Sequence, residues 1–453
     1  MSDEGLVAAS VTNGAASVTN GVVEAEFSPQ VQLNLNVRGL STSATVAINE
    51  RCAALVREGR EVVRLGLGQS PFPVPDVMVR ALREHAAEKD YLAVKGLLEL
   101  RRAIVGYYRR TQGLEYLPEN VLVGPGTKEL MFLVQLVYYG ELVIPAPSWV
   151  SYAPQARIIG RNLHWLPTEI ETGLGVSPEA LERVCAADPH RPRLLILNYP
   201  GNPTGTAYSD DQLREIAQVA RKYRVLLLAD EVYSGLRFDG EHVSIARYYP
   251  EGTIISNGLS KWAGAGGWRL GAFTFPATLT WLVDAMAAVA SETFTSTAAP
   301  IQYAAIHGFE SSAEWDDYLM RARKVLRGLM LHSYDRLRSV GAELAPPKGG
   351  FYVFPNFTAP RTKLAERGIK SSRELCERAL DELGVAVLPG SVFGRPDHEL
   401  SVRISCVDFD GGIALDAAGE LGADEDPGED FLQKYCNPTF DAINRLADWV
   451  ADS

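Results

Sequence analysis

The segment VLLLADEVY (225–233) decides the fold, because five consecutive apolar residues run directly into two carboxylates. Comparable apolar runs, with longer amphipathic stretches between them, occur at VLVG (121–124), ELVIPAP (141–147), RLLILNYP (193–200) and TIISNG (253–258). Runs this continuous are typical of parallel strands that helices cover on both faces. The sequence therefore predicts an α/β fold whose large domain has a mainly parallel sheet covered by helices on both faces.

A second domain is indicated where the pattern of the chain changes. After about residue 320 one long charged helical stretch is followed by several short apolar runs, which is typical of a smaller α+β domain. We expect the large domain at 86–325 and the small domain at 33–85 and 326–453.

Two segments have compositions that do not suit a packed core. Residues 1–32 are rich in Ala, Ser, Val, Gly and Asn, which predicts a flexible N-terminal tail. Residues 408–430 hold nine acidic and no basic side chains around Gly and Pro. We therefore expect an acidic, solvated insertion in the small domain.

The composition excludes several classes of protein. A formal net charge of −12 would repel the phosphate backbone of a nucleic acid. No uninterrupted apolar run is long enough to span a membrane. The five cysteines lack the paired spacing of a zinc site or a disulfide framework, so we expect no metal and a reducing cytoplasm. Because the first basic residue is Arg38, we expect no targeting segment.

Asp230 and Tyr233 follow a strand that should be buried on both faces. Open α/β sheets bind their ligands at the carboxyl ends of the strands, and a buried carboxylate is costly unless a cation or strong donor meets it. A protonated ring nitrogen would be such a partner for Asp230, and Tyr233 could reach the same ligand. The alternative is an aspartate that caps a helix.

Lys261 lies in SNGLSKWAGAGGWRLG (256–271), among glycines and tryptophans rather than other charges. Desolvation would lower its pKa and leave a neutral amine suited to forming a Schiff base. Arg269, eight residues later, would supply a fixed cation for a phosphate. Taken singly, both could be surface charges.

Three further segments carry polar residues where a ligand could bind. In VLVGPGTKEL (121–130), the helix start at Thr127 would offer free backbone amides to a phosphate, although an ordinary glycine-rich turn is the favoured explanation of this segment taken alone. In NPTG (202–205), Asn202 either presents its amide or scaffolds the loop. Arg403, inside an apolar strand, needs an anion, which could be a substrate carboxylate or a structural salt bridge.

Taken together, these segments resemble the class I and II aminotransferases of the fold type I pyridoxal-phosphate superfamily, which are aspartate aminotransferase-like. The resemblance runs from about Leu40 to Cys406, with the segments in the family's order. Its most specific motifs are Asn202 to Gly205, Asp230 to Tyr233, and Ser260-Lys261 followed by Gly267-Trp268-Arg269. The cofactor that this resemblance implies is pyridoxal 5'-phosphate, in the large domain.

The resemblance also implies a role for each matching residue. Lys261 would carry the cofactor as a Schiff base, Asp230 would partner the pyridine nitrogen, and Tyr233 and Asn202 would donate to the ring 3-oxygen. The other implied cofactor contacts are Gly126, Thr127, Lys128, Trp149, Ser260, Arg269 and, toward the phosphate of a partner subunit, Tyr91. The implied substrate contacts are Gly68, Trp149, Asn202 and Arg403.

The implied function is transfer of an α-amino group between an amino acid and a 2-oxo acid, by a homodimer with shared active sites. Two positions depart from the family's usual pattern: Gly266, where it commonly has Thr, and Gly258, where it often has Ser. These departures leave an alternative open, a pyridoxal-phosphate lyase, cyclase or oxidase acting on an amino acid with the same scaffold.

Overall fold

A seven-stranded sheet organises the larger part of the computed structural model, which describes residues 33–422 and 425–452. The tail expected at 1–32 lies outside the described residues. Strand order is β1-β7-β6-β5-β4-β2-β3, and only β7 runs against its neighbours. The strands are β1 (Val121–Gly124), β2 (Glu141–Ala146), β3 (Leu163–Pro167), β4 (Arg193–Asn198), β5 (Leu226–Asp230), β6 (Thr253–Gly258) and β7 (Gly271–Thr274).

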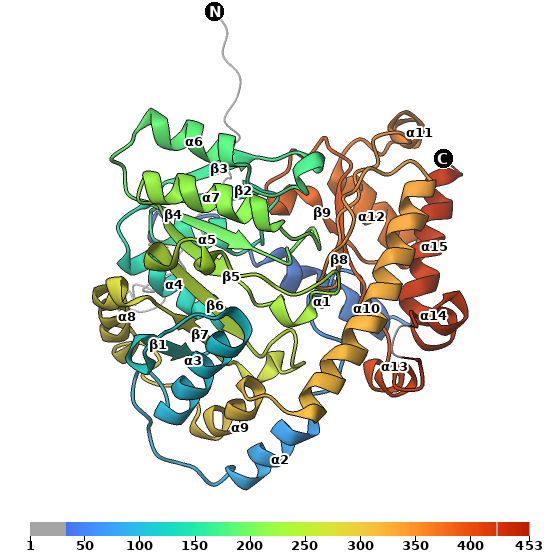
Figure 1. The fold of residues 1–453 in the computed structure, drawn as a ribbon. Helices are drawn as coiled ribbons and strands as arrows, with labels where there is room; N and C mark the ends of the chain where they lie inside the picture. The colour runs from blue at the N-terminus through green and yellow to red at the C-terminus, as the bar shows by residue number, and fades with distance from the viewer. Residues whose placement is uncertain (1–32, 423–424, 453) are drawn as a thin grey trace, which may run out of the picture.

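Both faces of this sheet are covered, as the continuous apolar runs predicted. On β5, Leu226 and Leu228 pack into one apolar core, while Leu227 and Ala229 pack into another on the opposite face. Figure 1 shows the sheet between its helices. One face carries α4 (Thr127–Val137), α5 (Tyr152–Ile158) and α8 (Thr280–Ser291), and the other carries α3 (Leu98–Gln112), α6 (Pro178–Ala187), α7 (Asp210–Lys222) and α9 (Ala299–Phe309). The predicted α/β architecture is confirmed.

A smaller α+β part lies beside the large sheet, on the right of Figure 1. Its antiparallel sheet has the order β8-β10-β9 and packs with helices of the C-terminal part of the chain. The elements are β8 (Tyr352–Val353), β9 (Leu388–Pro389), β10 (Val402–Ser405), α10 (Ala313–Ser339), α11 (Arg361–Glu366), α12 (Ser372–Leu383) and α15 (Asn437–Ala451).

The N-terminal segment joins this smaller part, and α1 (Ala44–Arg57) packs near β9. Val63 forms a parallel bridge with Val385, and Ser405 N–H donates to the Leu65 carbonyl oxygen. In contrast, α2 (Asp76–Glu84) packs against α9 of the larger part. The division at residues 85 and 326 stays a prediction, and the contact of α2 favours an earlier first boundary.

The solvated insertion expected at 408–430 is wrong for residues 411–418 and stays a prediction for the rest of the stretch. Residues Gly411–Ala418 form helix α13, which packs on α10 and buries Ala414 and Ala418 in the main core. Helix α14 (Glu429–Tyr435) follows. Ala414 and Ala418 are four residues apart and therefore lie on the same side of a helix, where they form an apolar face. A count of acidic residues does not reveal such a face.

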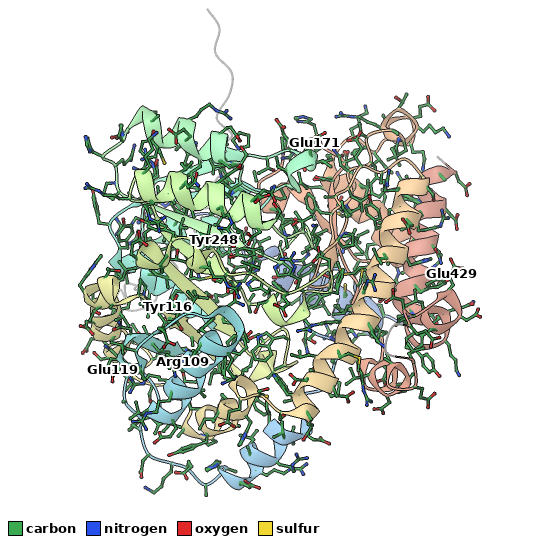
Figure 2. The ribbon with its side chains drawn as sticks, viewed as in Figure 1. Arg109, Tyr116, Glu119, Glu171, Tyr248 and Glu429 are labelled. Atoms are coloured by element: carbon green, nitrogen blue, oxygen red, sulfur yellow. The ribbon has the colours of Figure 1, made fainter. Side chains whose placement is uncertain are left out.

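The excess of negative charge lies largely in solvent. Exposed carboxylates such as Glu171 and Glu429 lie at the periphery of the molecule (Figure 2). Helix α10 is long, yet it carries many charged side chains. Within 33–422 and 425–452, no helix combines the length and the apolar character that crossing a bilayer requires.

The start of α13 offers a matched pair of substitutions that tests its packing. A Cβ atom at Gly411 would overlap the Pro71 carbonyl group, whereas one at Gly412 would meet only Asp410 Oδ1, at 3.4 Å. We expect Gly411→Ala to lower the free energy of unfolding by about 1–3 kcal/mol through overpacking. Gly412→Ala should raise it by about 0.5–1 kcal/mol, as alanine does in helices. Urea denaturation of both variants checks this, and equal effects would contradict the packing of α13.

Candidate active site

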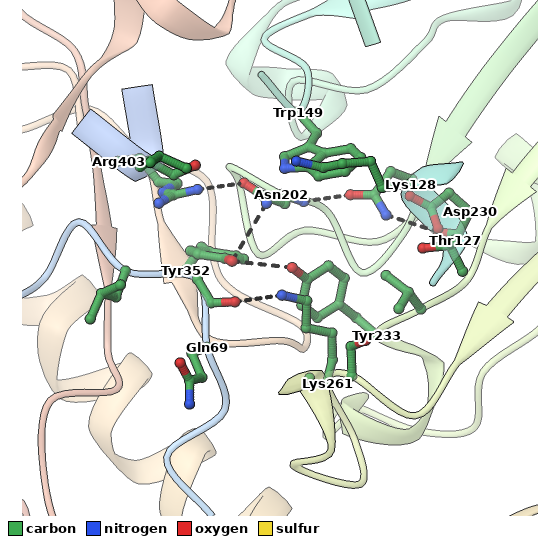
Figure 3. A pocket seen from close by; sticks show the side chains of 18 of the residues that line it. Gln69, Thr127, Lys128, Trp149, Asn202, Asp230, Tyr233, Lys261, Tyr352 and Arg403 are labelled. Carbon is green, nitrogen blue, oxygen red and sulfur yellow. Dashed lines mark hydrogen bonds between the residues drawn. The ribbon is translucent and has the colours of Figure 1, made fainter. Parts of the chain in front are cut away.

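A cavity of about 520 Å³ opens where the carboxyl ends of β4 and β5 face the smaller part of the molecule. It brings together most of the residues singled out in the sequence (Figure 3). Those that line it are Gly68, Thr127, Lys128, Trp149, Asn202, Asp230, Tyr233, Ser260, Lys261, Arg269 and Arg403. Tyr91 lies outside the cavity and is 91% exposed in the single chain.

Asp230 ends β5 and is almost completely buried. It accepts hydrogen bonds from the Tyr152 hydroxyl at 2.6 Å and the Ser256 hydroxyl at 3.2 Å. Desolvation raises the pKa of Asp230 to about 6, although both hydrogen bonds oppose that rise. Within the described residues, no Lys or Arg nitrogen lies within 4.0 Å of this carboxylate. The site therefore lacks a cation that the charged form of Asp230 requires.

Lys261 projects from the loop after β6 into the same cavity, where its Nζ donates to the Gly68 carbonyl oxygen. Desolvation and, to a smaller extent, the positive charge of Arg403 together lower the pKa of Lys261 to about 8, while Asp230 acts in the opposite direction. An amine with this pKa is substantially neutral under mildly alkaline conditions and is a competent nucleophile.

A chain of hydrogen bonds connects the large and small parts across the cavity (Figure 3). The hydroxyls of Tyr233 and Tyr352 lie 3.1 Å apart, and Asn202 Nδ2 donates to the Tyr352 hydroxyl at 3.5 Å. Arg403 Nη1 donates to Asn202 Oδ1 at 3.1 Å. These contacts position Tyr233 and Asn202 on one side of the space in which a ligand would bind.

Arg403 is fully buried, and its Nη2 donates to the Gly66 carbonyl oxygen at 2.6 Å. Its Nε is buried without a hydrogen-bond partner in the described part of the chain. No carboxylate of the described residues lies within 4.0 Å of the guanidinium, so the structural salt bridge considered from the sequence has no partner. The geometry suits an anion that enters from the cavity.

The start of α4 and Arg269 form a corner suited to a phosphate. Helix α4 begins at Thr127, directly after Gly126. A Cβ atom at position 126 would lie 2.5 Å from Arg269 Nη2, so the glycine permits the guanidinium to approach the helix start. Free amides and a cation at a helix N-terminus are the usual elements of a phosphate site. Lys128 lies beside it, with its Nζ 5.1 Å from the centre of the Trp149 ring.

Sequence reasoning missed Tyr152 and the contribution of α1. Tyr152 lies three residues after Trp149, and a helical turn there brings its hydroxyl to Asp230. Thr45 and Asn49 on α1 also line the cavity, four residues apart on one helix face. Tyr152 could have been found from its spacing to Trp149, whereas α1 reaches the site only through tertiary packing.

The chain matches the family model for aminotransferase class I and II over residues 60–410. The chain belongs to this family. It is 33% identical over 387 residues to an aspartate aminotransferase of Geobacillus stearothermophilus, which covers 83% of this chain and 94% of the relative. The aminotransferase is therefore a pyridoxal-phosphate enzyme, and the lyase, cyclase or oxidase alternative is not favoured.

Solved structures of aminotransferases have the same fold. The aspartate aminotransferase of Thermus thermophilus with maleate matches with a TM-score of 0.77 and 29% identity, covering 92% of this chain and 100% of that structure. An aromatic aminotransferase from Pyrococcus horikoshii OT3 matches with a TM-score of 0.72 and 27% identity, covering 88% and 99%. The chain therefore shares its fold with enzymes of this family from two other organisms.

The cavity of this aminotransferase fits pyridoxal phosphate. The buried Asp230 suits a protonated ring nitrogen, and the corner between Gly126 and Arg269 suits the phosphate. The unpaired Nε of Arg403 suits a carboxylate of the substrate. The departure at Gly266 is compatible with this arrangement, because a Cβ atom there would meet no heavy atom closer than 3.5 Å and the loop has room.

The pKa of Lys261 gives a test of the cavity's electrostatics. We expect capture of added pyridoxal phosphate by cofactor-free enzyme to accelerate as pH rises through about 8, because only the neutral amine attacks the aldehyde. Arg403→Gln removes a positive charge that lowers the Lys261 pKa, so the midpoint should move to higher pH. Stopped-flow absorbance measures the rate of cofactor capture.

Arg395→Gln is the control, since Arg395 pairs with Glu399 at 2.8 Å outside the cavity. An unchanged midpoint in Arg403→Gln would contradict the coupling.

Proposed function

We propose that this aminotransferase transfers the amino group of an acidic amino acid, such as aspartate, to a 2-oxo acid, with Lys261 forming the Schiff base to the cofactor. One observation carries the proposal: a lysine of lowered pKa and a buried carboxylate that lacks a protein cation line the same cavity. The names of the relatives, aspartate aminotransferases, support the acidic donor.

Each residue has a proposed part in binding the cofactor. Pyridoxal phosphate, when bound, supplies an electron sink that stabilises negative charge on the substrate Cα. Asp230 keeps the proton on the ring nitrogen, because its carboxylate otherwise has no cationic partner. Tyr152 and Ser256 hold that carboxylate in place.

The remaining cofactor contacts surround the ring and the phosphate. Tyr233 and Asn202 donate to the ring oxygen, and the face of Trp149 stacks on the ring. The phosphate corner at the start of α4 consists of Gly126, Thr127, Lys128, Ser260 and Arg269.

Lys261 is also proposed to transfer the proton of the substrate Cα. Released from the cofactor, its Nζ would accept the proton from the substrate Cα as a neutral amine and return it as an ammonium group. A pKa near 8 permits both forms near neutral pH. The Gly68 carbonyl oxygen, which accepts a hydrogen bond from Nζ, keeps the amine at the mouth of the substrate space.

The charge of the cavity favours an acidic substrate. Its lining contains the cations Lys128, Lys261, Arg269 and Arg403 against the single carboxylate of Asp230. The cofactor phosphate and the substrate α-carboxylate offset part of this excess. A second substrate carboxylate would offset more, and Lys128, exposed beside Trp149, is within the cavity to meet it.

We also propose a homodimer with shared active sites in the cytoplasm. Tyr91 supports the dimer, because a tyrosine that is 91% exposed in the single chain is available to a partner subunit's phosphate. The five cysteines, all free and buried, support a reducing compartment.

Borohydride reduction tests the role of Lys261 and the donor together. The resting enzyme should retain a pyridoxyl group on the peptide that contains Lys261, as measured by mass spectrometry. Prior incubation with aspartate should decrease the amount of this label far more than incubation with alanine, because a good amino donor releases Lys261 from the cofactor. Lys261→Ala should carry no label there. A label on another lysine would overturn the assignment, and equal loss with both donors would overturn the acidic preference.

Arg403→Lys separates substrate binding from folding. Lysine keeps the charge but loses the planar fork, which removes a charge-assisted hydrogen bond worth about 1.5–3 kcal/mol. The KM for aspartate should therefore rise about tenfold to a hundredfold, while the Tm changes little. Arg395→Lys, in the same part of the molecule but outside the cavity, should leave KM unchanged. Loss of folding in Arg403→Lys with an unaltered KM in the folded fraction would indicate a structural role.

A further inference from the structure

A second cavity, of about 430 Å³, lies behind the active site and shares no lining residue with it. The two cavities are separated by the backbone that follows β5 and β6. Tyr233 lines the first cavity, and the next residue, Ser234, lines the second. In the same way Lys261 faces the first and Trp262 the second. The second cavity is of the size that small organic molecules occupy in proteins.

His242 supplies a buried polar group without a satisfied partner in this cavity. Its side chain is only 7% exposed, and its Nε2 lies 3.1 Å from Oε2 of Glu231, which is itself 1% exposed. This contact does not meet hydrogen-bond geometry, so neither ring nitrogen has a hydrogen-bond partner among the described residues. A buried imidazole in this condition is costly unless an acceptor reaches it.

Arg323 supplies a cation that the protein does not neutralise. Its Nε donates to the Gly235 carbonyl oxygen at 2.8 Å, which fixes the guanidinium at the cavity wall. No carboxylate within 33–422 and 425–452 lies within 4.0 Å of it. The neighbouring Arg237, in contrast, is paired with Asp239 at 2.8 Å.

The acidic side chains around the cavity do not replace a ligand for these groups. Glu310 is paired with His307 at 3.2 Å. Glu241 and Asp316 are exposed and lie at the rim, where water screens them. Arg110, the half-buried Arg323 and the buried His242 are therefore the groups that an entering anion would meet.

One part of the remaining wall is aromatic. The rings of Tyr107 and Trp262 are nearly parallel, with their centres 6.3 Å apart. Trp315 packs against Trp262, with ring centres 5.2 Å apart, and Leu319 completes the apolar lining. Aromatic walls beside a fixed guanidinium favour a ligand with a flat apolar body and a carboxylate.

We propose that this cavity is a second binding site, for an organic carboxylate with an aromatic body. The carboxylate accepts hydrogen bonds from Arg323 or His242, and the body lies against Tyr107 and Leu319. Such a ligand contacts the backbone of Ser234 and Gly235 without entering the space that the substrate uses.

Calorimetric titration of the holoenzyme with benzoate tests the proposal. Saturating maleate first occupies the active site, so that the remaining heat reports the second cavity. We expect one benzoate to bind per chain under these conditions. Benzyl alcohol, which lacks the carboxylate, and acetate, which lacks the ring, should each bind at least about tenfold more weakly, because a charge-assisted hydrogen bond or the aromatic contact is lost.

Two variants locate the site. Arg323→Gln and, independently, His242→Gln should each weaken the maleate-insensitive binding about tenfold or more while leaving turnover of aspartate measurable. Arg327→Gln is the matched control on α10, since Arg327 pairs with Asp426 away from the cavity. Absence of binding in the presence of maleate would overturn the proposal, as would benzoate binding that neither variant weakens.

Discussion

The active site depends on a carboxylate that the chain buries without a cation of its own. Asp230 ends a strand whose other side chains fill the apolar cores on both faces of the sheet. An uncompensated buried charge costs several kcal/mol, and two neutral hydroxyls offset only part of that cost. The position therefore suits a ligand that brings a proton or a positive charge. Under the proposed function, cofactor binding and the energetics of the sheet are coupled at this single residue.

The cations of the cavity, in turn, lack an anionic partner in direct contact among the described residues. Arg403 has an unpaired Nε, and Lys261 is held close to Arg403, whose charge lowers its pKa. Mutual repulsion of these cations is tolerable only because anions enter with the ligands. In the proposed function a phosphate and a carboxylate would supply the missing anions, so the proposed specificity follows from the charge balance of the fold.

The sequence predicted what depends on local pattern and failed where tertiary packing decides. Continuous apolar runs identified the sheet, and the polar residues directly after them identified Asp230 and Lys261, because strand ends converge at one edge. The acidic stretch misled, since charge counts ignore the periodicity that buries Ala414 and Ala418. Thr45 and Asn49 could not be found, because no local pattern places α1 beside β9.

The glycine at 258, a departure from the family's usual serine, follows from how closely β6, β7 and α4 approach. Gly258 pairs with Gly271 across the two strands, and a Cβ atom at 258 would lie 2.8 Å from the Leu270 carbonyl oxygen. A Cβ atom at 271 would overlap the backbone nitrogen of Thr127. The glycine at 271 thus lets the start of α4 lie directly against the two strands whose connecting loop carries Lys261 and Arg269. A side chain at 258 would press on the backbone of β7 at Leu270 and Gly271, and β7 in turn packs against the start of α4. The close packing of β6 on β7 therefore favours glycine over the family's usual serine at this position.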